Sequence, residues 1–84
     1  MSEAATHEAI NICGVLVHAL PDQIEQVQQN LLQYDGLEIH NVGEDGRIIV
    51  TIDHPQRRQM IDTINQLSSV EGVLSAAMVY QHTE

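Results

Sequence analysis

The sequence predicts an α+β fold in which four strands and two helices follow one another in the order βαββαβ. Three observations support this prediction. Two segments have apolar residues at helical spacing, four segments are rich in β-branched or alternating apolar residues, and the two halves of the chain repeat at an offset of 36 residues. All 84 residues are assigned to one domain, because a chain of this length supports a single hydrophobic core.

The first half contains the strongest strand pattern of the chain. Residues 10–19 are nearly all apolar or β-branched, which is typical of a central strand packed on both faces. Pro21 suits the first position of a helix, where no backbone donor is needed, and apolar residues at helical spacing extend this helix over 21–33. We expect Gly36 to end it in the left-handed conformation.

The alternating residues 37–42 predict a half-buried or edge strand that completes the first half. The acidic turn at 43–46 predicts a hairpin into a strand over 47–53. Pro55 is expected to open a second helix, and residues 70–80 supply the fourth strand. The inward stripe of the second helix is predicted to be Met60, Ile61, Ile64 and Leu67.

The internal repeat defines how these elements combine. At the offset of 36, Ile12 matches Ile48 and Gly36 matches Gly72. Each half is therefore one βαβ unit that cannot bury its sheet face alone. Packing both units together gives the ferredoxin-like βαββαβ fold, a four-stranded antiparallel sheet with two helices on one face.

Two helices leave the other sheet face open, and alternation along each strand predicts which residues lie on it. The fourth strand divides into a bulkier set, expected in the core, and a slimmer set, expected on the open face. The bulkier set is Leu74, Ala76, Met78 and Tyr80, and the slimmer set is Val73, Ser75, Ala77 and Val79. The other strands are expected to add Ile12, Gly14, Leu16, His18, Glu38, His40, Val42, Ile49 and Thr51.

This predicted open face is apolar and has low relief at Gly14, Ser75 and Ala77. A solvated sheet face would normally carry charged side chains and Thr instead. A helix about 10 Å across could lie in such a trough. Two other readings remain, namely that the face pairs with its copy in a homodimer or that the chain termini cover it.

The charge of the chain restricts its partners. Twelve acidic residues stand against three arginines, and the formal net charge is −9. Such a surface repels nucleic acid and anionic membranes and attracts a basic peptide. A solvated acidic surface that maintains solubility is the simpler reading of the same numbers.

The sequence contains no pattern for an enzyme or a cofactor site. Cys13 is the only cysteine and is expected to be a small core residue, so a CxxC pair is excluded. The five histidines are dispersed, which argues against a metal site. Residues 1–9 are small and polar, lack an apolar targeting segment and are expected to be disordered, so we expect a cytoplasmic protein without cofactors.

Three stretches together resemble the NapD family of cytoplasmic chaperones for the periplasmic nitrate reductase. They are ICGVLVHALPDQIEQV, YDGLEIHNVGEDGRIIVTID and INQLSSVEGVLSAAMVY, and the resemblance extends over residues 10–82. It implies a protein that binds the twin-arginine signal peptide of the nitrate reductase catalytic subunit. Binding would hold back export until cofactor insertion and folding are complete, with the chaperone a monomer or weak homodimer.

Alternation, rather than any family motif, predicts the peptide-binding residues. They are Ile12, Gly14, Leu16, Glu38, Ile49, Thr51, Val73, Ser75, Ala77 and Val79, with Glu44, Asp45 and Asp53 as further contacts to the arginines of the peptide. A small-molecule regulatory module of the ACT or Lrp-effector kind has the same element order and is the alternative. A purely structural dimer subunit is a third possibility.

Overall fold

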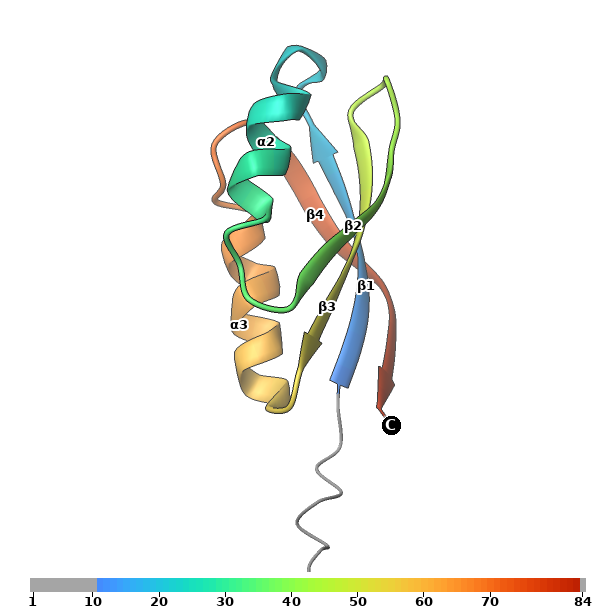
Figure 1. Cartoon of the computed structure of the whole chain (residues 1–84), viewed down its shortest axis with the longest axis vertical. Coiled ribbons are helices and arrows are strands. Elements are labelled where there is room, and N and C mark those ends of the chain that lie inside the picture. The colour runs from blue at the N-terminus through green and yellow to red at the C-terminus, as the bar shows by residue number, and fades with distance from the viewer. Residues whose placement is uncertain (1–10, 84) are drawn as a thin grey trace, which may run out of the picture.

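The computed structural model describes residues 11–83, which form a four-stranded antiparallel sheet with both helices on one face (Figure 1). The elements are β1 (Asn11–Ala19), the 3₁₀ helix η1 (Pro21–Gln23), α2 (Ile24–Leu31), β2 (Leu37–Val42), β3 (Arg47–His54), α3 (Arg57–Leu67) and β4 (Val73–Thr83). The strand order β2-β3-β1-β4 confirms the predicted ferredoxin-like fold and the central position of β1. The expected disordered tail, residues 1–9, lies outside the described residues.

The core lies between the helices and the sheet. Every second residue of the two central strands is fully buried there, as the alternation predicts. Burial of each aliphatic side chain contributes about 1.5–3 kcal/mol. The fully buried side chains of these strands are Cys13, Val15, Val17, Ala19, Ile48, Val50 and Ile52, and the helices add Val27, Leu31, Met60 and Leu67.

Both helices begin later than their prolines suggest. Pro21 opens a single 3₁₀ turn before α2, and α3 begins at Arg57, two residues after Pro55. His54 Nδ1 accepts a hydrogen bond of 3.0 Å from the backbone N–H of Gln56, which holds the chain at the entry to α3. Ile61 was expected in the core, but it is exposed because the buried stripe of α3 follows Met60, Ile64 and Leu67, at positions i, i+4 and i+7.

The internal repeat extends to the backbone hydrogen bonds. After α2, the N–H of Tyr34 donates to the carbonyl of Leu31 at 3.1 Å, and after α3 the N–H of Val70 donates to that of Leu67 at 3.2 Å. These two bonds are 36 residues apart, like the matched positions in the sequence. The same turn therefore connects each helix to its following strand.

Two bulges interrupt the alternation of β4. The register with β1 shifts between Gly14 and Val15 and again between His18 and Ala19, so Val79 and Leu74 have no partner on β1. Each bulge moves the following side chains to the opposite face. Ala76 lies opposite Val17 and packs against the core, as predicted. Met78 lies opposite Val15, on the predicted face, but it is half exposed because β4 is an edge strand, so its predicted burial in the core is wrong.

The same bulges overturn three placements on β4. Val73 was predicted on the open face, but it lies opposite the buried Ala19 and packs against the core. Tyr80 and Leu74 were predicted in the core, but both are at least half exposed, and Tyr80 lies opposite Gly14.

A third bulge affects β2. The register with β3 shifts between Ile39 and Asn41, which leaves His40 without a partner in the ladder. Val42 therefore lies opposite the buried Ile48, on the helix side of the sheet, and its predicted outward orientation is wrong. The bulges occur on the two edge strands, while β1 and β3 pair with each other in continuous register.

Candidate functional site

The sheet face away from the helices is the candidate functional site. Directly opposite residues in an antiparallel sheet share a face, so the strand pairing aligns the residues of this face in rows. No helix among residues 11–83 packs on it (Figure 1). From β2 to β4 the rows are Asn41, Ile49, Leu16 and Ala77; then Glu38, Thr51, Gly14 and Tyr80; and, across the last three strands, Asp53, Ile12 and His82.

An apolar strip runs through the centre of this open face. Leu16 and Ile49 are partly buried by their neighbours, and Ala77 beside them is exposed. Gly14 contributes no side chain, and the ring of Tyr80 lies directly against it. The surface is therefore nearly flat over Leu16 and Ala77 and rises at Tyr80.

Most of the predicted site residues lie on this face, although their role in binding stays a prediction. Val79 is exposed in its bulge, without a partner on β1 that would fix its face. Val73 lies on the opposite face, as described above. The residues that the pairing places as predicted are Ile12, Gly14, Leu16, Glu38, Ile49, Thr51, Ser75 and Ala77.

The carboxylates at the rim differ in their surroundings. Glu38 Oε1 lies 3.8 Å from His40 Nε2, and the Glu38 side chain is 71% exposed. Asp53 is exposed near the end of β3, opposite Ile12. Asp45, in the hairpin turn with Glu44, already forms an ion pair of 3.4 Å with the Arg47 guanidinium. The end of the face that carries Glu38 and Asp53 therefore offers the stronger attraction for an added cation.

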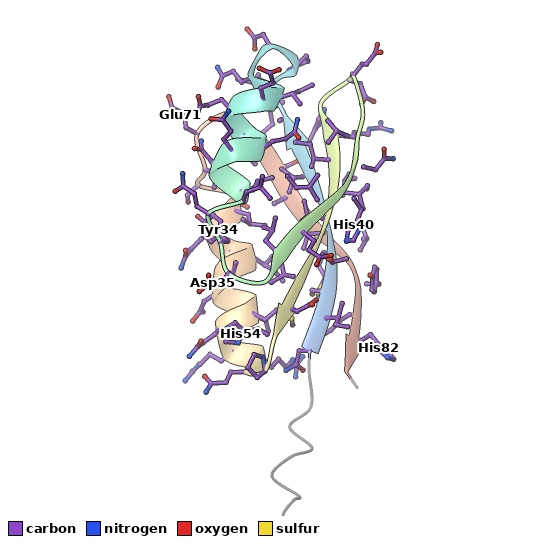
Figure 2. The ribbon with its side chains drawn as sticks, in the orientation of Figure 1. Tyr34, Asp35, His40, His54, Glu71 and His82 are labelled. Carbon is purple, nitrogen blue, oxygen red and sulfur yellow. The ribbon has the colours of Figure 1, made fainter. Side chains whose placement is uncertain are left out.

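Tyr80 is an open-face residue that alternation alone failed to identify. A glycine in a central strand leaves a gap that an aromatic side chain on the neighbouring strand often covers, so Gly14 was the available signal. His82 joins the same face opposite Ile12. Figure 2 shows His40 and His82 extending from the strands on the side away from the helices.

Cys13 is confirmed as a core residue. It is fully buried on the helix side of the sheet, where its Sγ lies 3.0 Å from Met78 Sδ. Burial raises the pKa of the Cys13 thiol, which keeps it protonated and unreactive at neutral pH. Within residues 11–83, no group of three metal-binding side chains comes together, and no helix is long and apolar enough to cross a membrane.

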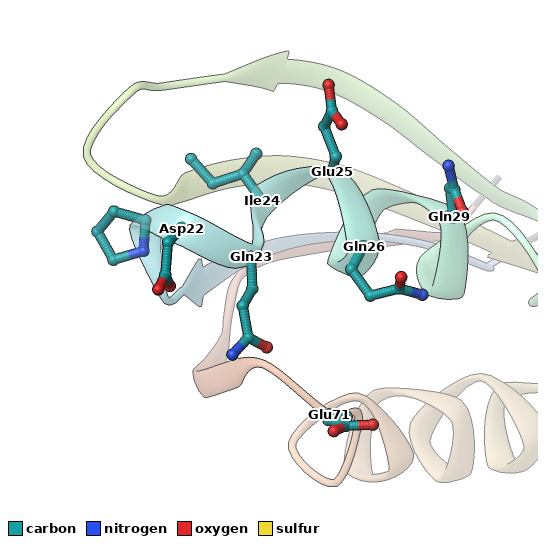
Figure 3. Close-up of a pocket in the computed structure, with 8 residues that line it drawn as sticks. Asp22, Gln23, Ile24, Glu25, Gln26, Gln29 and Glu71 are labelled. Atoms are coloured by element: carbon teal, nitrogen blue, oxygen red, sulfur yellow. The ribbon is translucent and has the colours of Figure 1, made fainter.

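A hollow lies elsewhere, at the start of α2 (Figure 3). It encloses about 600 Å³, and Glu71 borders it across from the helix. Asp22, Glu25 and three glutamines make its lining mostly polar, so it lacks an apolar stripe for a peptide helix. The flat open face, rather than this hollow, is the surface suited to an amphipathic segment.

Fold and face together define a small binding module whose sheet can receive an apolar, cationic segment. The family model described as NapD protein matches residues 10–84, and the chain belongs to the NapD family. It is 28% identical over 79 residues to Chaperone NapD of Escherichia coli and of Shigella flexneri, with 93% of this chain and 91% of each relative covered.

A solved structure extends the similarity to three dimensions. The chain matches the solution structure of the Escherichia coli Tat proofreading chaperone protein NapD with a TM-score of 0.80 and 28% identity. The match covers 89% of this chain and 80% of that one. These relatives are named as chaperones, which does not favour the alternative of a small-molecule regulatory module.

Proposed function

We propose that this protein binds the twin-arginine (Tat) signal peptide of the periplasmic nitrate reductase catalytic subunit in the cytoplasm. Binding holds back export until the enzyme has received its cofactor and folded. Membership of the NapD family and the similarity to a Tat proofreading chaperone support this function. The chaperone acts as a monomer or weak homodimer and is not itself an enzyme.

The observation that carries the proposal is the apolar strip with carboxylates beside it, on a face that no helix within residues 11–83 covers. A twin-arginine signal peptide combines two cationic residues with an apolar stretch that can form a helix. Its apolar side lies on Leu16, Ile49 and Ala77, where burial of apolar area contributes about 25 cal/mol per Å². Its arginines face Glu38 and Asp53, because Asp45 is already paired with Arg47.

The charge of the whole protein assists this encounter. The formal net charge of −9 attracts a cationic peptide from a distance and raises the association rate more than the final affinity. The affinity then depends on the apolar strip and on local pairing at the rim. Long-range charge attraction therefore contributes mainly to the association rate, and the apolar stretch of the peptide contributes mainly to the affinity.

The test is calorimetric titration of the full chain with a synthetic twin-arginine peptide and its double-lysine variant. Ala77→Trp places a bulky ring on the flat part of the strip, so we expect it to abolish binding while the circular dichroism spectrum stays native. Gln29→Trp, on the exposed surface of α2, is the matched control and should bind as the wild type does. Undiminished affinity of Ala77→Trp would remove the open face as the binding site.

A further inference from the structure

The second row of the open face ends in two groups that can each receive an arginine. Strand pairing aligns Glu38, Thr51, Gly14 and Tyr80 from one edge of the sheet to the other. Three interstrand spacings of about 4.8 Å separate the backbones at the two ends by about 14 Å, and the Tyr80 ring extends inward over Gly14. One end carries a carboxylate and the other an aromatic ring.

Two rings cover the middle of this row. The Tyr80 ring lies against Gly14, and the Thr51 hydroxyl is held by a hydrogen bond of 2.7 Å with His40 Nε2. A bound peptide therefore meets these rings rather than the backbone of the sheet. From that position, two neighbouring arginine side chains that point in opposite directions would extend toward Glu38 and toward the outer face of the Tyr80 ring.

Tyr80 is held in a suitable orientation. One side of its ring rests on Gly14, where even the Cβ atom of an alanine would collide with the ring. The Tyr80 residue is half exposed, so its ring also presents surface to solvent. A guanidinium is planar and weakly hydrated, and it stacks on an aromatic face better than an ammonium does.

We propose that Tyr80 and Glu38 are specificity-determining residues that each receive one arginine of the peptide pair. One guanidinium stacks on the Tyr80 ring, and the other pairs with the Glu38 carboxylate. This inference rests on the proposed function and gives a physical reason for a preference for arginine over lysine.

The opposing explanation is that Tyr80 only covers the gap above Gly14. In that case any apolar side chain of similar size would serve, and the arginines of the peptide would not respond to the change. Tyr80→Leu and Tyr80→Phe separate the two explanations, because leucine keeps apolar cover without a ring and phenylalanine keeps the ring. Glu25→Gln, an acid removed from the exposed surface of α2, is the control for Glu38→Gln.

The experiment is a set of double-mutant cycles by calorimetry between these variants and three peptides. The peptides carry both arginines, or alanine in place of the first or of the second. We expect Tyr80→Leu to weaken binding of the two-arginine peptide about three- to fivefold, and Tyr80→Phe to bind like the wild type. The loss from Tyr80→Leu should vanish with one single-alanine peptide, and the smaller loss from Glu38→Gln should vanish with the other.

The failures of the two proposals are distinguishable. If the wild type does not bind the two-arginine peptide, the proposed function is wrong. If the wild type binds this peptide while Tyr80→Leu lowers the affinity for all three peptides equally, or for none of them, Tyr80 covers Gly14 and does not recognise arginine. Thermal unfolding of each variant shows whether a lost affinity reflects a lost fold.

Discussion

Gly36 and Gly72 occupy equivalent positions in the two halves of the chain, with φ values of +78° and +92°. The carbonyl of Gly36 accepts the N–H of Asp53, near the end of β3, and that of Gly72 accepts the N–H of Leu20, directly after β1, both at 2.9 Å. Each half thus fastens the end of the other half's first strand. The repeat in the sequence corresponds to this reciprocal closure, which keeps the central strands of the sheet in place.

Replacing either glycine with alanine should destabilise the protein, and Gly36→Ala should do so more. Both positions have the left-handed φ that costs a residue with a Cβ atom about 1–2 kcal/mol. A Cβ at Gly36 would also collide with the backbone carbonyl of Asp53, whereas at Gly72 it meets side-chain atoms of Gln23 and Val27. Urea unfolding should therefore rank the free energies of unfolding as wild type, Gly72→Ala and Gly36→Ala, from highest to lowest.

Gly43→Ala is the control for these two substitutions. Gly43 has no positive φ, and the nearest atom to a new Cβ belongs to the flexible Asp45 side chain. We expect a change below about 1 kcal/mol, as for most surface substitutions. Equal losses at Gly36, Gly43 and Gly72 would contradict the argument from backbone conformation.

The sequence predicts the central strands better than the edges for a physical reason. β1 and β3 pair in continuous register, so alternation correctly assigned Val15 and Val50 to the core. Each bulge on β2 and β4 adds one residue to one strand. Alternation of apolar and polar residues assumes a regular strand, so it cannot detect the added residue. Val73 and Tyr80 were misplaced for this reason, and Tyr80 then became the most informative residue of the candidate site.

The contact between Gly14 and Tyr80 predicts a coupled pair. Gly14→Ala forces the Tyr80 ring off its support, and overpacking of this kind costs about 1–3 kcal/mol. Tyr80→Ala removes the obstacle, so the double variant should be more stable than the sum of the single losses predicts, by about 0.5–3 kcal/mol. Chemical unfolding of the four proteins measures this coupling, and strict additivity would show that the ring does not rest on Gly14 in solution.

Titration of the buried Cys13 thiol should lower the free energy of unfolding in alkali. Burial raises the pKa of this thiol above its ordinary value of 9.0, with a smaller opposing effect from Arg57. The unfolded chain therefore releases the proton first as the pH rises, so stability present below about pH 9 declines above it. Cys13→Ala lacks this titration. The difference in unfolding free energy between wild type and Cys13→Ala should shrink from about pH 7 to about pH 10, and a constant difference would contradict the burial of the thiol.

The ionic strength of the solution should separate the two contributions to peptide binding. Raising the salt from about 0.1 to about 1 M shortens the screening length from about 10 to about 3 Å, which weakens exposed pairs such as those proposed for Glu38. We expect the association rate and the affinity for the two-arginine peptide to fall with salt, and to fall less steeply in Glu38→Gln than in the wild type. Glu25→Gln, which removes the same charge on the other side of the sheet, should keep a dependence of affinity on salt close to that of the wild type.

The apolar strip is not screened, so Ala77→Trp should still prevent binding at high salt. If the affinities of the wild type, Glu38→Gln and Glu25→Gln are all independent of salt, the Glu38 carboxylate has no role in peptide binding.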